Sequence, residues 1–267
     1  MRLNAKTSAL IATSLICAHA SSLQAEKVCP TGSVTRGVDV GVYQGAVDWN
    51  AVAAAGYTFG IARFSDGGSL DAQFAANWTG MKAAGLVRGA YQFFEPKQDP
   101  IAQALGLLGA LGPLGVGDLP PALDVEVSGG LSPASLFGAI QSWVSTVQQA
   151  IGRRPLLYTN AGFWNGSVVQ PGPAGTDLWV ANWGVSCPTN PTGWSNWALW
   201  QNSSTGTVNG IGAGVDLDEF NGSQAALAAY ASTWTTAPEP TSLALIAVGL
   251  AAIGVAPRRR ERRVSCS

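Results

Sequence analysis

The sequence predicts an α/β protein built as a single modified β/α barrel with eight strands, in which helices are missing from the last third. Three observations support this fold class. The chain has 267 residues, 47% of them hydrophobic, and can bury a full core. Strand-like runs alternate with helical patterns through the first half of the chain. Later strand-like runs follow one another with little room for helices, so a TIM-like barrel must be modified there.

Turn and cap residues mark the elements in order. The second predicted helix is stopped by Gly85, the third begins at Pro100, and a serine stands near the start of the fourth. The predicted helices cover residues 47–55, 71–84, 100–111 and 132–151. The predicted strands cover residues 36–40, 57–64, 86–94, 119–126, 155–159, 177–182, 197–202 and 214–217.

The fourth predicted strand ends in two carboxylates. Pro120 and Pro121 halt the preceding segment, and an apolar run then leads into Asp124-Val125-Glu126. Because side chains alternate along a strand, Asp124 and Glu126 point the same way, about 7 Å apart. Two acids on one partly buried surface have pKa values that split, as acid/base chemistry on a glycosidic bond requires. The alternative interpretation is that both acids cap a following turn.

Other polar residues also fall near predicted strand ends. In a β/α barrel the working residues lie at the carboxyl ends of the strands, so these side chains are expected at one mouth. They are Asp39, Tyr91, Asp124, Glu126, Tyr158, Asn182, Gln201 and Asp216. Acids that converge from separate strands favour a catalytic site over turn capping.

Composition excludes several kinds of site and partner. The only histidine, His19, lies in the first 25 residues, so the mature protein has no Ser-His-Asp site, Cys-His site or histidine-bearing zinc site. Residues 26–240 contain eight basic and fifteen acidic residues, a formal net charge of −7, and no cluster of Lys and Arg. This balance argues against nucleic acid as a partner. The chemistry that remains is carboxylate chemistry without a metal.

The N-terminal segment predicts export. Residues 1–25 combine basic residues, an apolar run and small residues, which is typical of a secretory signal peptide. Cys17 lies in that segment and Cys266 in the opposite tail, which leaves Cys29 and Cys187. In an exported protein these two predict a disulfide, with two unpaired thiols as the alternative.

The C-terminal segment has three parts after the predicted barrel domain of residues 30–232. A linker over 233–240 contains Pro238-Glu239-Pro240, an apolar segment over 241–257 is a candidate transmembrane span, and 258–267 is a basic cytoplasmic tail. This arrangement resembles the PEP-CTERM sorting signal of bacterial envelopes. The resemblance implies export across the inner membrane and anchoring until an exosortase-type enzyme processes the segment, leaving the protein in the envelope, at the surface or outside. A permanent tail anchor is the alternative.

Six blocks between residues 36 and 221 carry a second resemblance. They are Gly37-Val38-Asp39-Val40 with Tyr43-Gln44-Gly45, Gly89-Ala90-Tyr91, Leu123-Asp124-Val125-Glu126, Leu178-Trp179-Val180-Ala181, Trp200-Gln201 and Val215-Asp216-Leu217. Together they resemble glycoside hydrolase family 25, the Chalaropsis-type lysozymes. The resemblance implies a modified β/α barrel, no cofactor, and cleavage of the β-1,4 bond between N-acetylmuramic acid and N-acetylglucosamine in peptidoglycan glycan strands. We expect a monomer.

The resemblance also implies catalytic acids at Asp39, Asp124, Glu126 and Asp216. We expect Glu126 to be the general acid/base, with a pKa raised by Asp124 and apolar surroundings. Asp124 would stabilise positive charge on the sugar or orient its 2-acetamido group, and Asp39 and Asp216 would hold the assisting acid or a water. The expected substrate-binding residues are Tyr43, Tyr91, Tyr158, Asn182, Trp183 and Gln201. Some members of a late tryptophan cluster, Trp183, Trp194, Trp197 and Trp200, can line a glycan groove.

The sequence departs from the family pattern in places. Arg63-Phe64-Ser65-Asp66 stands where Lys-Ala-Thr-Glu is usual, and Gln92 stands where histidine is common. Asp218 and Glu219 add negative charge beside Asp216, which predicts a raised pKa for that group. Two other functions stay open: a chitinase-like hydrolase, because Asp-x-Glu at a strand end also resembles family 18 chitinases, and a non-catalytic envelope protein that binds glycan.

Overall fold

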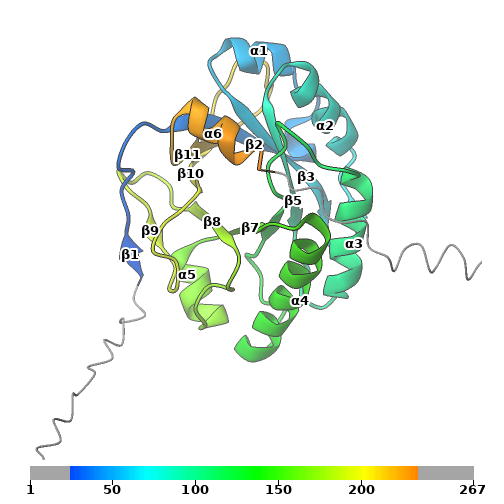
Figure 1. The fold of residues 1–267 in the computed structure, drawn as a ribbon, viewed down its shortest axis with the longest axis vertical. Coiled ribbons are helices and arrows are strands. Elements are labelled where there is room, and N and C mark those ends of the chain that lie inside the picture. Colours follow the sequence, from blue (N-terminus) through cyan, green and yellow to red (C-terminus); the bar gives the residue numbers. More distant parts are fainter. Residues whose placement is uncertain (1–24, 234–267) are drawn as a thin grey trace, which may run out of the picture.

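A closed β barrel forms the centre of the computed structural model, which describes residues 25–233 (Figure 1). The strands of the ring are β2 (Thr35–Val40), β3 (Phe59–Asp66), β5 (Val87–Phe93), β6 (Ala122–Asp124), β7 (Leu156–Thr159), β8 (Asp177–Ala181), β10 (Leu199–Gly206) and β11 (Val215–Phe220). The sheet also contains β4 (Ser69–Leu70), which pairs only with β3. The ring closes because β2 pairs with both β3 and β11. The predicted α/β barrel with eight strands is confirmed.

The direction of the last strand differs from a regular β/α barrel. Neighbouring strands from β2 through β10 run parallel, whereas β11 runs antiparallel to both β10 and β2. Only residues 207–214 join β10 to β11. A parallel return needs a crossover of a dozen residues or more, so this short connection forces the chain to turn back along its neighbour.

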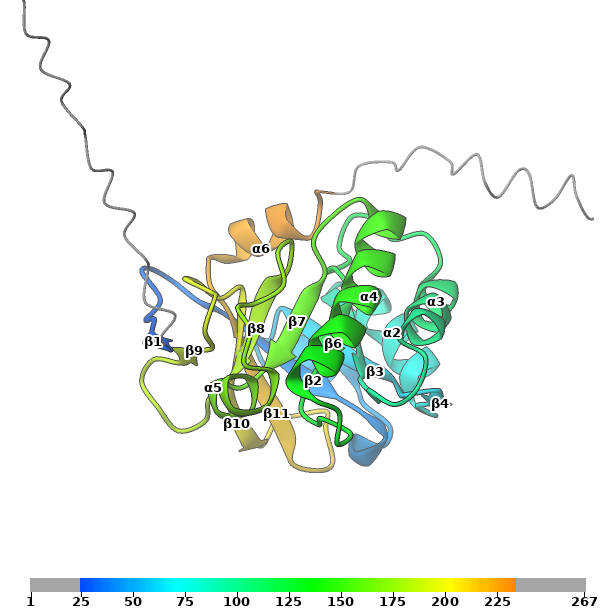
Figure 2. The ribbon, with the colours of Figure 1, turned by 90° about the horizontal axis from the view of Figure 1, so that it is seen from below.

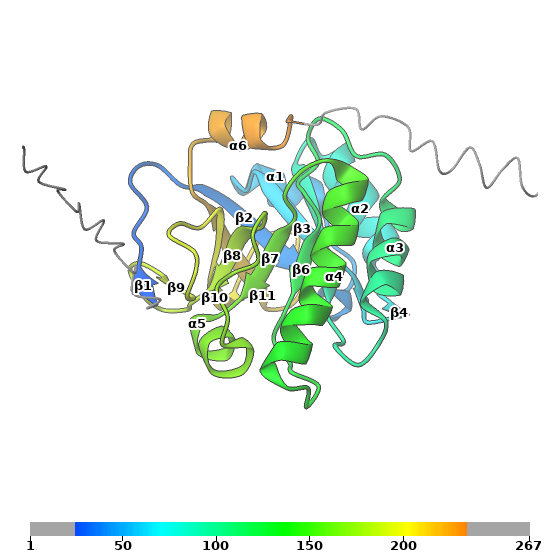
Figure 3. The ribbon, with the colours of Figure 1, turned by 60° about the horizontal axis from the view of Figure 1, so that its bottom comes forward.

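Helices, three of them with ten or more residues, follow the early strands, as predicted. They are α1 (Trp49–Ala54), α2 (Phe74–Ala83), α3 (Pro100–Leu111) and α4 (Pro133–Ile151). The side chains of Asp48, Asp99 and Ser132 cap α1, α3 and α4 by accepting hydrogen bonds from backbone N–H groups of the first turn. After β7 only short elements occur: α5 (Ala161–Phe163), the π-helix η2 (Trp164–Val168) and α6 (Gln224–Tyr230). The predicted loss of helices from the last third is confirmed; Figure 3 shows the helices α2 to α4 gathered on one side of the barrel.

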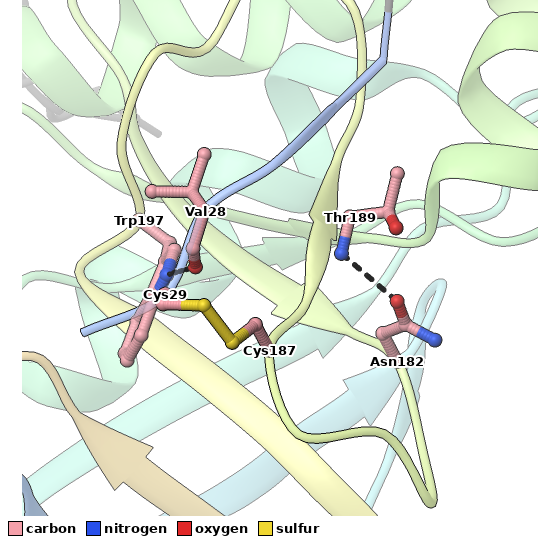
Figure 4. The surroundings of a disulfide bond; sticks show 6 residues. All are labelled: Val28, Cys29, Asn182, Cys187, Thr189 and Trp197. Carbon is pink, nitrogen blue, oxygen red and sulfur yellow. Dashed lines mark hydrogen bonds between the residues drawn. A yellow bond between two sulfur atoms is a disulfide. The ribbon is translucent and has the colours of Figure 1, made fainter.

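The N-terminal segment covers part of the side without long helices (Figure 2). Here β1 (Glu26–Lys27) pairs antiparallel with β9 (Thr189–Asn190), ahead of the predicted domain start at residue 30. The predicted disulfide between Cys29 and Cys187 is confirmed, and beside it the indole Nε1 of Trp197 donates to the carbonyl of Val28 at 2.8 Å (Figure 4). Val28 also packs on the tryptophan cluster of this side. The N-terminal segment and its disulfide thus cover this side of the barrel, where no long helix packs among the described residues.

The barrel interior is apolar at one end and polar at the other. Its apolar part includes Phe59, Ile61, Leu119, Leu156, Leu199 and Phe220, together with Leu227 and Ala231 from α6. Helix α6 therefore closes the end of the barrel where the parallel strands begin. Close packing there requires glycine at position 37 in β2, because a Cβ on Gly37 would overlap the ring of Phe59. The polar end, where the parallel strands finish, is left open.

The predicted signal peptide and the predicted C-terminal segments lie outside the described residues, apart from their residues 25 and 233. Within residues 25–233, no helix combines the length and the apolar character that crossing a membrane requires.

Candidate active site

The carboxyl ends of the parallel strands open into a cleft of about 370 Å³. Side chains from many strands line it, so residues far apart in the sequence meet there. The lining residues are Asp39, Gly41, Tyr43, Gln44, Arg63, Asp66, Tyr91, Phe93, Asp124, Glu126, Tyr158, Trp179, Gln201 and Asp216. All four predicted catalytic acids are therefore brought together, along with four of the six predicted substrate-binding residues.

A larger hollow, of about 520 Å³, lies at the opposite end of the barrel beside α6. It is lined by residues that precede or begin strands, such as Asp177 and Trp197, and by Tyr230 of α6. None of the predicted catalytic acids reaches it. The smaller cleft, which contains all four predicted catalytic acids, is therefore the candidate active site.

The two acids of the Asp-x-Glu run face this cleft together, as side-chain alternation predicts. Strand β6 ends at Asp124, and Val125 points the other way into the core beneath the helices. Hydrogen bonds from the Val125 N–H to the carbonyl of Tyr158 and from Thr159 Oγ1 to the carbonyl of Val125 hold the chain in register past the strand end. Asp124 is buried, with 6% exposure, whereas Glu126 is half-buried and more accessible to a ligand.

Burial raises the pKa of both carboxyls. The pKa of Asp124 lies well above its ordinary value because of burial and then the charge of Glu126, while Arg63 acts in the opposite direction. The pKa of Glu126 is also raised by burial, and its hydrogen bond with Tyr158 lowers it. Burial is the largest cause for both groups, and the repulsion between the two carboxylates disfavours the state in which both are ionised. Acids of this kind can hold and deliver a proton near neutral pH.

Asp39 and Asp216 are register partners on the neighbouring strands β2 and β11, so they lie side by side on the same face of the sheet. Because β11 is antiparallel, Asp216 lies at the start of its strand and still reaches the open mouth. Burial and the nearby Glu126 raise the pKa of Asp216 to about 6. The sequence predicted a raised pKa for this group from the charges of Asp218 and Glu219; burial is the largest cause, Glu126 adds to it, and repulsion between Asp216 and Asp218 also raises the pKa of Asp218.

Asp218 is a site residue that sequence reasoning missed, having treated it only as extra charge. It lies two residues beyond Asp216 on β11 and is 2% exposed, deeper in the barrel than the cleft wall. Its Oδ1 accepts a hydrogen bond from Trp179 Nε1 at 2.8 Å, and its carboxyl is hydrogen-bonded to that of Asp39. Burial raises the pKa of Asp218 to about 8, and burial and Asp218 together raise that of Asp39. The period-two spacing of Asp216 and Asp218 was the available signal.

Gln201 organises the polar side of the cleft. Its Oε1 accepts hydrogen bonds from the Tyr158 hydroxyl and from Trp183 Nε1, both at 2.9 Å, and its Nε2 donates to Asp39 Oδ2 at 2.7 Å. The indole nitrogen is only a donor, so it fixes which way the amide of Gln201 points. The amide therefore holds the carboxyl of Asp39 in one orientation.

Two aromatic side chains stand at the rim. Tyr43 is 78% exposed and lines the cleft, and Trp183 is 53% exposed while its indole N–H is bound to Gln201. Tyr91 lies deeper, packed edge to face against Trp179. Exposed aromatic faces beside a polar cleft suit the stacking of sugar rings.

Asn182 does not line the cleft, unlike the other predicted strand-end residues. Its Oδ1 accepts a hydrogen bond from the backbone N–H of Thr189, and its carbonyl accepts one from Trp200 Nε1, so it supports the loop between β8 and β9 (Figure 4). Trp197 and Trp200 are buried packing residues of the helix-poor side rather than groove residues. Their indole N–H groups bond to backbone carbonyls, which explains why both can be buried.

The cleft also contains residues that the sequence did not single out as site residues: Gly41, Gln44, Arg63, Asp66, Phe93 and Trp179. Arg63 carries the one basic side chain among the residues that line the cleft. Within residues 25–233, no group of three or more His, Cys, Asp or Glu residues is arranged to hold a metal ion. The chemistry that the described cleft offers is that of carboxyl groups, amides and one guanidinium.

Comparison with protein families finds two matches in this chain. The model of Glycosyl hydrolases family 25 matches residues 38–211, which include four of the five acids that line the cleft and three of the four predicted catalytic acids. The PEP-CTERM protein-sorting motif matches residues 236–260. The predicted C-terminal sorting signal is thus confirmed at the level of sequence.

Individual relatives agree with the family match. Lysozyme M1 of Streptomyces globisporus is 35% identical over 212 residues, covering 75% of this chain and 72% of its own. The N,O-diacetylmuramidase of Chalaropsis sp is 31% identical over 205 residues, covering 68% of this chain and 95% of its own. The crystal structure of the lysozyme from Streptomyces coelicolor superimposes with a TM-score of 0.71 at 34% identity, over 74% of this chain and 97% of that one. The chain belongs to glycosyl hydrolase family 25.

Proposed function

We propose that this protein is a lysozyme that hydrolyses the β-1,4 bond between N-acetylmuramic acid and N-acetylglucosamine in peptidoglycan. Relatives named as lysozymes and N,O-diacetylmuramidases from bacteria and fungi support this activity. The observation that carries the proposal is the pair Asp124 and Glu126, which face one cleft with raised pKa values. Glycoside hydrolysis needs two carboxyl groups in different protonation states on either side of the scissile bond.

The two carboxyls take different roles because their surroundings differ. Glu126 is the more accessible, and burial favours its protonated form, so it donates a proton to the leaving oxygen. Burial is the largest cause that raises the pKa of Asp124 and it persists, but once Glu126 is neutral its repulsion is gone, and Arg63 favours the carboxylate form of Asp124. The protonation states of the pair are thus coupled, with one proton placed on the residue that can reach the substrate.

Asp124 stabilises the reacting sugar in this scheme. Its Oδ1 is buried and has no hydrogen-bond partner within the described residues. A carboxylate oxygen of this kind can accept the N–H of a 2-acetamido group and orient that group for attack, or stabilise positive charge on the ring. Asp39, held by Gln201, and Asp216 complete the mouth, where they hold a water or the assisting acid.

The sorting motif supports delivery of this activity to the cell envelope. We propose that the protein crosses the inner membrane by its N-terminal signal peptide and is anchored through residues 241–257 until an exosortase-type enzyme processes it. The disulfide between Cys29 and Cys187 fits an oxidising compartment outside the cytoplasm. We also propose that the protein acts as a monomer.

Glu126→Gln provides the test of the catalytic proposal. Wild type, Glu126→Gln and the control Glu219→Gln are incubated with purified peptidoglycan, and soluble fragments with new reducing ends are quantified between pH 4 and 8. We expect wild type to release fragments ending in N-acetylmuramic acid, Glu126→Gln to lose at least about a hundredfold in rate, and Glu219→Gln to stay near wild type, because Glu219 does not line the cleft. Binding without release by the wild type would favour the non-catalytic alternative, and cleavage of chitin oligomers alone would favour the chitinase-like one.

A further inference from the structure

Arg63 is the basic side chain of an otherwise acidic cleft, and its position is firmly fixed. Its Nε donates to Asp71 Oδ2 at 2.9 Å, and its side chain is 14% exposed. Asp71 is itself buried and also accepts hydrogen bonds from the backbone N–H groups of Val42 and Gln73. The carboxylate that anchors the guanidinium is therefore shared among three donors.

The loop after β2 closes on the same guanidinium from another side. The ring of Tyr43 lies with its centroid 5.1 Å from Arg63 Cζ, and a Cβ on Gly41 would come within 3.3 Å of Arg63 Nε. Nε is bound to Asp71 and the Tyr43 side chain also hydrogen-bonds to this guanidinium, so a ligand in the cleft that Arg63 lines would be met by the edge of the two terminal nitrogens. A guanidinium edge held in this way matches the two oxygens of a carboxylate.

The substrate of the proposed function supplies such a group on one of its two sugars. N-acetylglucosamine carries no charge, whereas the N-acetylmuramic acid side bears a lactyl group and, through it, a peptide with carboxylates. Five acids line the cleft, Asp39, Asp66, Asp124, Glu126 and Asp216; those that are ionised repel a substrate carboxylate, and Arg63 is the lining side chain whose charge attracts one. We propose that Arg63 is a specificity-determining residue that binds a carboxylate on the muramyl side of the substrate, either the free lactyl carboxylate or the D-glutamyl carboxylate of the stem peptide. This inference rests on the proposed function for its substrate.

Three substrates separate the two sources of the carboxylate. The first is uncross-linked glycan with stem peptides that carry a free D-glutamyl carboxylate, the second is the same glycan amidated at that position, and the third is glycan stripped of peptide, with free lactyl carboxylates. The values of kcat/KM are measured on each for wild type, Arg63→Lys and Arg63→Gln. Arg154→Gln is the matched control, because it removes an equal charge from an exposed arginine at the opposite end of the barrel.

We expect wild type to prefer one carboxylate substrate over the amidated glycan by about tenfold or more, since charge-assisted hydrogen bonds are about twice as strong as neutral ones. Arg63→Gln brings this ratio to within about twofold, mainly through KM, and Arg154→Gln keeps the wild-type ratio. Arg63→Lys retains the charge felt by Asp124 but loses the planar fork, so it loses most of the preference for the carboxylate substrate over the amidated glycan. An equal loss on all three substrates in Arg63→Gln, or a wild-type ratio within twofold on both carboxylate substrates, would overturn the inference.

A binding measurement keeps this inference separate from catalysis. Calorimetric titration of wild type and Arg63→Gln uses the disaccharide dipeptide ending in D-glutamine, whose α-carboxylate is free, the same compound with both glutamyl carboxyls amidated, and the peptide-free disaccharide with its free lactyl carboxylate. A preference for a carboxylate compound that disappears in Arg63→Gln supports the inference even if wild type cleaves no glycan, an outcome that would refute only the proposed function. Equal binding of all three compounds by wild type would refute the inference while leaving cleavage untouched.

Discussion

Removal of the disulfide by Cys29→Ser with Cys187→Ser tests how strongly the N-terminal segment stabilises the barrel. The bond joins residues 158 positions apart, so most of the described chain lies within the loop that the bond closes and remains restricted in the unfolded state. In the chain-entropy model a loop of that length corresponds to about 5 kcal/mol of stability. For a domain of this size each kcal/mol shifts Tm by about 2–4 °C, so the expected loss is about 10–20 °C.

The assay is differential scanning calorimetry of the oxidised wild type, the double variant and the wild type under reductant. The double variant and the reduced wild type are expected to lose similar stability, because both lack the cross-link; Cys29 is exposed, and only at Cys187, which is 9% exposed, does serine place a hydroxyl in a buried position. The prediction assumes that the segment of β1 stays on the barrel until global unfolding, held by the β1–β9 pairing and by the bond from Trp197 Nε1 to the Val28 carbonyl. A difference in Tm under about 3 °C would refute the reasoning, since it would mean that the cross-link does not constrain the unfolded state.

Two further predictions concern the barrel interior. The pKa of Asp218, about 8, lies above its value in the unfolded chain, so its contribution to stability is complete below about pH 4 and is lost as pH rises through 8. Asp218→Asn, whose side-chain oxygen still accepts the hydrogen bond from Trp179, should therefore reduce the fall in Tm between pH 5 and pH 8 by about 3 °C or more. An unchanged fall in Tm would contradict this. Gly37→Ala places a methyl group against the ring of Phe59 and should cost about 1–3 kcal/mol in urea unfolding, whereas Gly109→Ala, in open space on α3, should be neutral or slightly stabilising.

Local signals predicted most of the fold. Pro100 and Ser132 mark helix starts by chemistry that acts within one turn, and α3 and α4 begin there as expected. The apolar run before Asp124 likewise predicted a buried strand, although β6 is shorter than expected and ends at that residue. Side-chain alternation was enough to place Asp124 and Glu126 in one cleft, because that rule depends only on neighbouring residues.

Features that depend on distant partners were not predictable in the same way. The antiparallel course of β11 follows from the short connection that precedes it, but its neighbours β2 and β10 become known only once the ring closes. Asp218 is a site residue because it meets Asp39 and Trp179 inside the barrel, and Asn182 is not one because its side chain bonds to the Thr189 backbone. The sequence marks the chemistry of such residues, whereas their environment comes from tertiary contacts.

The position of α6 decides how the enzyme is held when its C-terminus is tethered. The described chain ends at Thr233, directly after this helix, which packs across the end of the barrel where the parallel strands begin. The cleft opens at the other end. If residues 241–257 anchor the protein as proposed, the tether leaves from the end of the barrel opposite the mouth, so the attachment point does not cover the cleft. For such an anchored enzyme, the distance at which glycan can enter the cleft would be set by the length of chain between Thr233 and the anchor.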